Sequence, residues 1–445
     1  MKLWDKGFSV DEKIEQFTIG KDRELDLLLA PHDILGTIAH ITMLQSVGLL
    51  SEDELLKLLK LLKLLYKDAA QGNFTIEEGV EDIHSQVEFL LTQQLGDMGK
   101  KVHTGRSRND QVLLDLKLFT RSQIESTVGK VSHLFEVLQQ KSEQYKDVLL
   151  PGYTHLQVAM PSSFGLWFGA YAESLTDDMQ MMLAAWNIAN QNPLGSAAGY
   201  GSSAPLNRTL TTHLLGFADL NYNSVYAQMT RGKMERSVAF AYASLAETIG
   251  RLAADACLFN SQNFRFITLP DSLTTGSSIM PHKKNPDVFE LTRAHCNKIN
   301  SVPESIRLIT TNLPSGYFRD MQLLKEVYLP LFQEMDDILD IVTYAVENMQ
   351  VTEHLMDNPQ YQVAFSVEEV NHLVSQGVPF RDAYKQVGHD ILDGTFQFHG
   401  TLHHTHEGSI GNLCNQQIQQ KMQHILSAFT FAQVHECIEK LVSQG

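Results

Sequence analysis

Apolar residues at three- and four-residue spacing recur along most of the chain and predict helices. Ser51 followed by Glu54 is a capping-box pattern that starts a leucine-rich helix over 55–66, and a further helix is expected over 81–91. An earlier helix, within 30–50, is marked by an apolar stripe of Ile34, Ile38, Ile41, Leu44 and Val47. The first 105 residues therefore have the pattern of a helical N-terminal domain.

Much longer helical patterns follow. Helices of roughly thirty residues exceed the usual globular length and are typical of a bundle of parallel rods. From about residue 351 the patterns shorten and become rich in His and Gln. The sequence thus predicts an all-α fold of three helical domains, 1–105, 106–350 and 351–445, with no strand-rich segment. The long patterns cover 109–145, 162–190, 236–263, 287–311 and 322–349.

The long helices would expose wide apolar faces if the chain stayed single. Burial of such faces drives association, and identical subunits usually assemble symmetrically. We therefore expect helices from several copies of the chain to complete one core.

The net charge and the positions of the cysteines exclude some classes of function and location. The net charge of −17 argues against nucleic acid as a partner, because phosphate binding needs a basic face. We see no signal peptide and no run of about 18 apolar residues, so we expect no membrane span. The four widely spaced cysteines, Cys257, Cys296, Cys414 and Cys437, indicate free buried thiols in a reducing cytoplasm.

The most unusual stretch is the polar loop 276–287. It begins at Gly276 and is interrupted by Pro281 and Pro286, so it is neither a regular helix nor a central strand. Apolar helical patterns on both sides suggest that the loop is held between packed helices, which favours an anion-handling role over a solvated loop. The loop lacks a P-loop order and a nucleophile elbow.

Three other polar segments interrupt the helices. Segment 103–111 carries two arginines with Thr, Ser and Asn at a helix start, which favours a carboxylate or phosphate receptor over a simple N-cap. Segment 153–157 contains His155, which alone is more often structural than an acid or base. Gln322 and Lys325 are spaced to share one helix face, although for this segment alone a solvated helix start is the favoured interpretation.

A histidine-rich stretch near the C-terminus invites a metal interpretation. Its spacing fits no standard zinc signature, and an exposed loop is the simpler reading, so we expect no metal site. The histidines are His399, His403, His404 and His406.

The loop from Gly276 to Asn285 resembles the G-S-S-x-M-P-x-K-x-N signature of the fumarase/aspartase lyase superfamily. Together with 103–111, 151–157 and 377–381, it is similar to the argininosuccinate lyase/delta-crystallin family from about Thr18 to Gly388. The resemblance implies an all-α homotetramer whose active sites are each built from three subunits. It also implies reversible cleavage of argininosuccinate to arginine and fumarate, without a cofactor.

The resemblance further implies roles for individual residues. Ser277 would take the Cβ proton, Lys283 and Asn285 would stabilise the aci-carboxylate, and His155 would act as acid or relay beside Glu290. Ser278 offers a further oxygen near this centre. The positions that resemble substrate-binding ones are Ser107, Arg108, Asn109, Thr154 and Arg231, with Thr18, Asp22, Asp82, Tyr317, Gln322 and Lys325 around the arginine-derived half.

The chain also departs from the family pattern. Val158 and Met160 follow the Thr-His-Leu-Gln segment, and Gly232 follows Arg231, where the family tends to have other residues. Two alternatives therefore stay open. One is a lyase for a related succinyl adduct, either an acylated argininosuccinate or adenylosuccinate. The other is a non-catalytic, crystallin-like structural protein.

Overall fold

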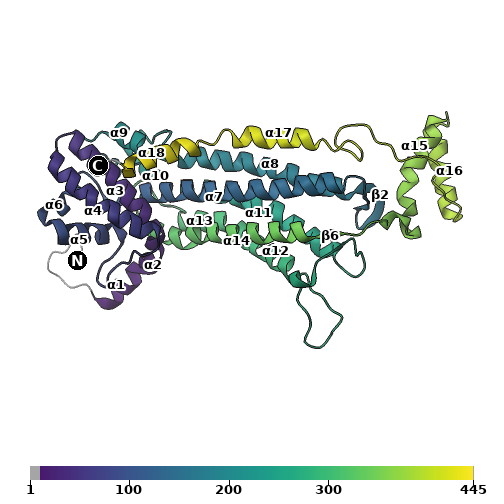
Figure 1. Cartoon of the computed structure of the whole chain (residues 1–445), viewed down its shortest axis with the longest axis horizontal. Coiled ribbons are helices and arrows are strands. Elements are labelled where there is room, and N and C mark those ends of the chain that lie inside the picture. Colours follow the sequence, from purple (N-terminus) through teal and green to yellow (C-terminus); the bar gives the residue numbers. More distant parts are fainter. Residues whose placement is uncertain (1–10, 444–445) are drawn as a thin grey trace.

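The computed structural model describes residues 11–443 and is an elongated, almost wholly helical molecule (Figure 1). The N-terminal helices form one end, long helices run along the axis, and a helix pair forms the far end. The all-α prediction is confirmed. The N-terminal helices are α1 (Glu12–Ile19), α2 (Asp22–Asp26), α3 (Ala30–Ser46), α4 (Glu52–Ala70), α5 (Ile83–Leu95) and α6 (Asp97–Lys100).

The predicted capping box is present at the start of α4. The Ser51 side chain accepts from the Glu54 N–H, and the Glu54 carboxylate accepts from the Ser51 N–H at 2.9 Å. These two bonds satisfy N–H groups that the first turn leaves without helical partners. The apolar face of α4 then packs with α3 and α5 in a core separate from that of the long helices.

The long helices pack around a single apolar core. The start of α8 lies tightly against the end of α7 at Gly165, where a Cβ atom would lie 2.6 Å from the Ser142 carbonyl oxygen of α7 and 2.5 Å from Lys146 Cα just after it. A side chain at this position would push the two elements apart. The bundle consists of α7 (Arg108–Gln144), α8 (Phe164–Ala189), α11 (Lys233–Phe259), α12 (Asp287–Asn300), α13 (Val302–Ile309) and α14 (Leu324–Asn348), with the short α9 (Arg208–Leu214) and α10 (Ser224–Met229) beside it.

The predicted single helix over 287–311 is wrong. The chain forms two helices, α12 and α13, separated at Ser301. Pro303 lies in the first turn of α13, where its missing N–H costs nothing, whereas it would remove a hydrogen bond in mid-helix. The apolar periodicity continues through the break, so the pattern alone did not reveal it.

Three small two-stranded sheets interrupt the helices within the described residues. The largest is the antiparallel hairpin of β1 (Leu149–Thr154) and β2 (Gln157–Ser163), where the sequence predicted only a polar segment between helices. The other pairs are β3 (Gln191–Asn192) with β4 (Asp219–Leu220), parallel, and β5 (Ile267–Thr268) with β6 (Gln350–Val351), antiparallel.

The C-terminal part extends along the whole molecule, from the far end back over the long helices to the N-terminal end (Figure 1). The pair α15 (Ser366–Ser375) and α16 (Phe380–Leu392) forms the far end around a small core of its own. In contrast, α17 (Asn415–Leu426) packs on α8, and α18 (Phe431–Ser443) reaches α3 and α9. The three-domain division stays a prediction, and its last region extends from one end of the molecule to the other.

The histidine-rich stretch lies against α15. His399 Nδ1 lies 3.0 Å from Glu369, and His404 Nε2 lies 3.2 Å from Glu368. These contacts tie the loop after α16 back to the helix pair.

Two further expectations can be compared with the structure. The helical stretch 13–46 is long and apolar enough to cross a membrane by composition, but 72% of its apolar window is buried in the molecule, as in a core helix. All four cysteines are free thiols. Cys296 alone among them is buried, so the expectation of buried thiols is wrong for the other three, which are partly exposed.

Candidate functional site

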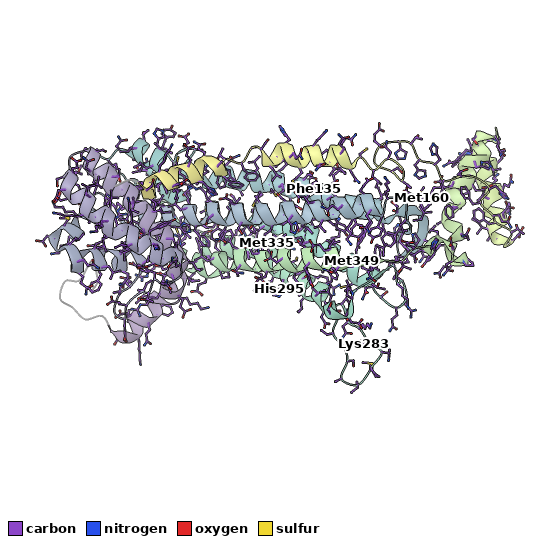
Figure 2. The ribbon with its side chains drawn as sticks, viewed as in Figure 1. Phe135, Met160, Lys283, His295, Met335 and Met349 are labelled. Atoms are coloured by element: carbon purple, nitrogen blue, oxygen red, sulfur yellow. The ribbon has the colours of Figure 1, made fainter. Side chains whose placement is uncertain are left out.

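The residues predicted to form the site lie in three separate places of one chain. Most of the predicted substrate-binding residues line a cavity between the N-terminal helices and the near end of the long helices. Thr154 and His155 lie at the tip of the β1–β2 hairpin, towards the far end. The loop 276–286 projects from the side of the bundle, with Lys283 near its tip (Figure 2). A single chain therefore does not assemble these groups into one site.

The cavity has a volume of about 160 Å³ and polar, charged walls. It brings together α2, α5, the start of α7 and the start of α14, elements that lie far apart in sequence. Of the predicted residues it contains Asp22, Asp82, Arg108, Asn109, Arg231, Tyr317, Gln322 and Lys325.

Lys325 is buried in the cavity wall between two carboxylates. Its Nζ lies 3.0 Å from Asp22 Oδ1 and 2.6 Å from Asp26 Oδ1. Burial alone would lower the pKa of Lys325, but Asp26 and Asp22 raise it above its ordinary value. Burial raises the pKa of the Asp22 carboxyl, while Lys325 counteracts this. The arrangement therefore keeps a cation fixed at the base of the cavity.

Arg108 extends across the cavity from the first turn of α7. Its guanidinium lies 2.9 Å from Glu81 Oε2 and 3.2 Å from Asp82 Oδ2, and it donates to Ser85 Oγ at 2.7 Å. Asp82 in turn caps α5 by accepting from the Ser85 N–H. Burial opposes ionisation of Asp82, but the charges of His84 and Arg108 lower its pKa below the ordinary value. Arg108 is thus held by protein carboxylates, and Asp82 remains an anion facing the cavity.

Thr18 and Gln322 are joined at the rim of the cavity. The Gln322 side-chain amide donates to the carbonyl oxygens of Thr18 at 2.8 Å and of Ile19 at 3.1 Å. Arg319 also donates to the Thr18 carbonyl at 2.8 Å. These bonds fasten the turn that precedes α14 to the end of α1, so both predicted residues are positioned next to the cavity.

Ser107 and Asn109 belong to the cap of α7. The Ser107 hydroxyl accepts from the Asn109 N–H, and the Asp110 carboxylate accepts from the Ser107 N–H at 2.9 Å. The cap leaves the Asn109 side chain facing the cavity, with no hydrogen bond to any residue from 11 to 443. The N-cap and receptor interpretations of this segment are therefore both compatible with the structure.

Arg231 is buried at the boundary of the cavity, and the departure at Gly232 has a structural reason. Gly232 has φ +78°, and its N–H donates to Glu235 at 2.6 Å. A Cβ there would lie 2.6 Å from Thr310 Cγ2. Glu235 also lies 3.1 Å from Arg231 Nε. A glycine therefore fits this corner, while Glu235 supplies the carboxylate.

Sequence reasoning missed several residues of the cavity. Asp26 and His84 carry recognisable chemistry, but each sits in an ordinary helical pattern, and only the packing of distant helices reveals their role. Arg319 lies between the predicted residues Tyr317 and Gln322 but was given no role. The missed lining residues with charged or titratable side chains are Asp26, Glu81, His84 and Arg319.

The loop 276–286 is exposed over most of its length, so the expectation that it is held between packed helices is wrong. An antiparallel bridge between Thr275 and Asn285 closes its base. Ser277 Oγ accepts from the N–H groups of Ile279 at 3.4 Å and Met280 at 3.1 Å. Such donors favour the anionic form of an oxygen. Lys283, by contrast, forms no ion pair with any described residue.

The hairpin tip holds His155 in a rare backbone conformation. His155 has φ +54° and Leu156 has φ +58°, and both lie between the paired residues Thr154 and Gln157. Positive φ at both central positions is typical of a type I′ turn, which favours Asn-Gly. A His-Leu pair there is strained, and such strain is concentrated at functional sites.

His155 and Glu290 are not paired within one chain. Neither forms an ion pair or side-chain hydrogen bond with the other, and both are exposed. The proposed pairing of these groups stays a prediction that a single chain does not test.

Within residues 11–443, one cluster has the residue types of a metal site: Asp33, His84 and Asp115, all buried. His84 Nδ1 lies 2.7 Å from Asp33 Oδ1 and 3.6 Å from Asp115 Oδ2. The shorter distance is that of a hydrogen bond, and it is less than the spacing of two atoms bound to the same zinc ion. The geometry therefore fits a shared proton better than a metal ion.

Comparison with known proteins identifies the family of the chain. A lyase family profile matches residues 8–300. Argininosuccinate lyase from Bacteroides fragilis is 63% identical over 443 residues, covering 100% of this chain and 99% of the relative. Argininosuccinate lyase from Thermotoga neapolitana is 36% identical, covering 87% and 97%.

Solved structures share the fold. An EDDS lyase in complex with formate has a TM-score of 0.74 at 20% identity, covering 98% of this chain and 94% of that one. A class II fumarase from Schistosoma mansoni has a TM-score of 0.67 at 16% identity, covering 93% and 95%. At these identities the likeness concerns the fold alone. With nearly two thirds of the sequence shared over the full length of the bacterial relatives, the chain belongs to the argininosuccinate lyase family.

Proposed function

We propose that this chain cleaves argininosuccinate reversibly to arginine and fumarate. The observation that supports this most is the 63% sequence identity, over the full length, to the argininosuccinate lyase from Bacteroides fragilis. The charged cavity and the Ser277 loop support it further. The cavity offers carboxylates for a cationic group and cations for an anionic one. These are the groups of a substrate that joins a guanidinium to a succinate.

The reaction is a β-elimination. Ser277 takes a proton from the Cβ of the succinyl moiety, and the electron pair left behind is delocalised onto the adjacent carboxylate. Lys283 and Asn285 stabilise the doubly charged aci-carboxylate. The electrons then form the C=C bond of fumarate as the bond from Cα to the guanidino nitrogen breaks, and an acid protonates that nitrogen. Losing one stabilising donor of this kind typically costs about 10²–10³ in rate.

Ser277 needs help to act as a base, because a serine hydroxyl has a high pKa. The two backbone N–H groups that point at its oxygen stabilise the alkoxide. His155 is our candidate for acid or relay, beside Glu290. Asp22 and Asp82 hold the arginine-derived half, with Tyr317, Gln322 and Lys325 around it.

The three places must come together for this reaction, so we propose a homotetramer with each site built from several subunits. Exposed apolar side chains on the long helices support this assembly, among them Phe240, Leu291, Leu308, Ile341 and Tyr344. Burying such faces favours association. We also propose a cytoplasmic location, in keeping with the free thiols.

Fumarate release, followed by its ultraviolet absorbance, tests the proposal. Purified protein should release fumarate from argininosuccinate and not from adenylosuccinate. Turnover of adenylosuccinate or of an acylated analogue, without turnover of argininosuccinate, would identify a different lyase. No turnover of any of these would favour a structural, crystallin-like protein.

A further inference from the structure

His84 lies at the floor of the charged cavity and has two chemically different sides. It occupies the first turn of α5, two residues after Asp82. Its Nδ1 lies 2.7 Å from Asp33 Oδ1 on α3, and Asp115 on α7 lies behind the same nitrogen at 3.6 Å. The ring also lines the cavity. Three helices thus fix the orientation of this imidazole from behind.

The other ring nitrogen has no partner. His84 Nε2 forms no hydrogen bond with any residue between 11 and 443. It is also not fully buried, unlike several other polar atoms without a partner. It therefore keeps contact with the open space of the cavity.

Each of the other cations of the cavity has at least one protein acceptor. Arg231 Nη1 has none among the described residues, but it is fully buried, so His84 Nε2 differs in being both without a partner and open to the cavity. A ligand that bound one of them would have to displace or share an existing bond. The engaged groups are Lys325 with Asp22 and Asp26, Arg108 with Glu81, Asp82 and Ser85, Arg319 with Glu81 and the Thr18 carbonyl, and Arg231 with Glu235 and the Met321 carbonyl.

The surroundings of His84 favour its charged form. Burial lowers the pKa of His84, but Asp33, Asp115 and Asp82 overcome this and raise it to about 9. Of the neighbouring bases, Arg106 is buried near the same carboxylates, and His103 has a pKa lowered to about 4 by burial and by Arg106. At neutral pH both nitrogens of His84 therefore carry protons, and Nε2–H is a charged donor.

We propose that His84 is a further substrate-contacting residue, whose Nε2–H donates to a carboxylate oxygen of the substrate in the cavity. Asp33 and Asp115 are its positioning residues. This inference rests on the proposed function, and it names the group that receives an anionic end of the substrate at the floor of the cavity.

Two substitutions separate contact with the substrate from support of the fold. His84→Asn places an amide near Nδ1, where it can still bond Asp33 but does not reach the cavity. His84→Gln places an amide near Nε2, facing the cavity. His40→Asn is the matched control, because His40 is also a buried histidine on this domain but bonds the Thr104 carbonyl and does not line the cavity.

The measurement is fumarate release from argininosuccinate, with KM and kcat determined for each variant. We expect KM of His84→Asn to rise about 10- to 100-fold, the effect of losing a hydrogen bond from a charged donor. KM of His84→Gln should lie between this value and that of the wild type. The control His40→Asn should keep the wild-type KM.

A pH series gives a second readout that a structural role would not move. Wild-type KM should rise as pH passes about 9, where His84 loses its proton, while His84→Gln should show no such rise. This comparison decides the matter even if His84→Asn does not fold.

Two results would overturn the inference. One is a wild-type KM in His84→Asn. The other is a combination of three observations: KM rises equally in both His84 variants, Tm falls equally in both, and His84→Gln still shows the alkaline rise of KM. Absence of turnover in the wild type would instead overturn the proposed function, so the two failures are distinguishable.

Discussion

Lys325 Nζ lies 2.6 Å from Asp26 Oδ1, although 299 residues separate them in the sequence. Both side chains are buried, and Asp26 also accepts from the Ile83 N–H through its other oxygen at 3.3 Å. This one carboxylate therefore links α2, α5 and α14. The contact helps to shape the cavity, because these three helices supply Asp22, Asp26, His84 and Lys325 to its lining.

Replacing Lys325 by methionine should destabilise the fold. Removing one partner of a buried ion pair leaves the other charge uncompensated, which costs about 3–5 kcal/mol. Chemical denaturation should show this loss in Lys325→Met. The double variant Asp26→Leu/Lys325→Met should recover part of it, since the fully buried Asp26 carboxylate is then removed and only the partly exposed Asp22 has lost its partner. A double variant at least as unstable as the sum of the single ones would contradict this account.

The sequence was informative where chemistry and local structure coincide. Short-range rules predict three features that the structure confirms. They are the capping box at Ser51, the start of α7 after Ser107 and the irregular loop that begins at Gly276. Gln322 and Lys325 were placed together by their spacing. Asp26 and His84 could not be found in this way, because their partners are brought to them by the packing of distant helices.

The misplaced features also have physical reasons. The apolar pattern over 287–311 continues through Ser301, so only Pro303 marked the break between α12 and α13. We expected the Ser277 loop to be enclosed because helical patterns precede and follow it in the sequence. Within one chain, however, those helices do not cover the loop. A site shared between subunits cannot be assembled from the contacts of a single one.

The pKa shifts of three histidines, His84, His103 and His32, favour the folded state most near pH 6.5. The pKa of His84 is raised from 6.5 to about 9, so its contribution is complete below pH 6.5 and is lost as pH rises through 9. His103 and His32 have pKa values lowered to about 4 and about 3, mainly by burial, so protonation in the unfolded state weakens the fold as pH falls below 6.5.

Thermal unfolding across pH 5–10 checks this expectation. The His84 contribution is at most about 3 kcal/mol, from 1.36 kcal/mol for each pKa unit. The alkaline decline of Tm should flatten in His84→Gln. If this variant declined as steeply as the wild type above pH 7, a different group would be responsible.

The hairpin tip should tolerate residues that accept positive φ and reject those that do not. Asn adopts the left-handed region readily, whereas a β-branched residue does so at a higher cost. Leu156→Asn should therefore keep or raise Tm and retain turnover. Leu156→Val should lower kcat, because the turn that presents His155 changes conformation. Equal kcat for the two variants would show that the backbone at Leu156 does not position His155.

Ser277→Ala should abolish turnover without loss of assembly. The substitution removes only the oxygen, and the loop carries no core contacts at this residue, so size-exclusion chromatography should give the wild-type elution volume. Asn109→Ala should also be inactive, because the Asn109 side chain faces the cavity and supports no other contact within the described chain. Turnover retained by either variant would remove that residue from the proposed site.

Mixing these two inactive variants tests whether sites are shared between subunits. In a tetramer assembled at random from equal amounts, a site that takes its loop from one subunit and its cavity from another receives two intact parts in about a quarter of cases. Co-expression with two different tags, followed by tandem purification, should therefore restore measurable activity. Ser277→Ala mixed with Lys283→Ala is the matched control and should stay inactive, because both lesions lie in the same loop and every site inherits one of them. If the Ser277→Ala and Asn109→Ala mixture also stayed inactive while forming mixed tetramers, the loop and the cavity would have to meet within one chain by a movement of the loop.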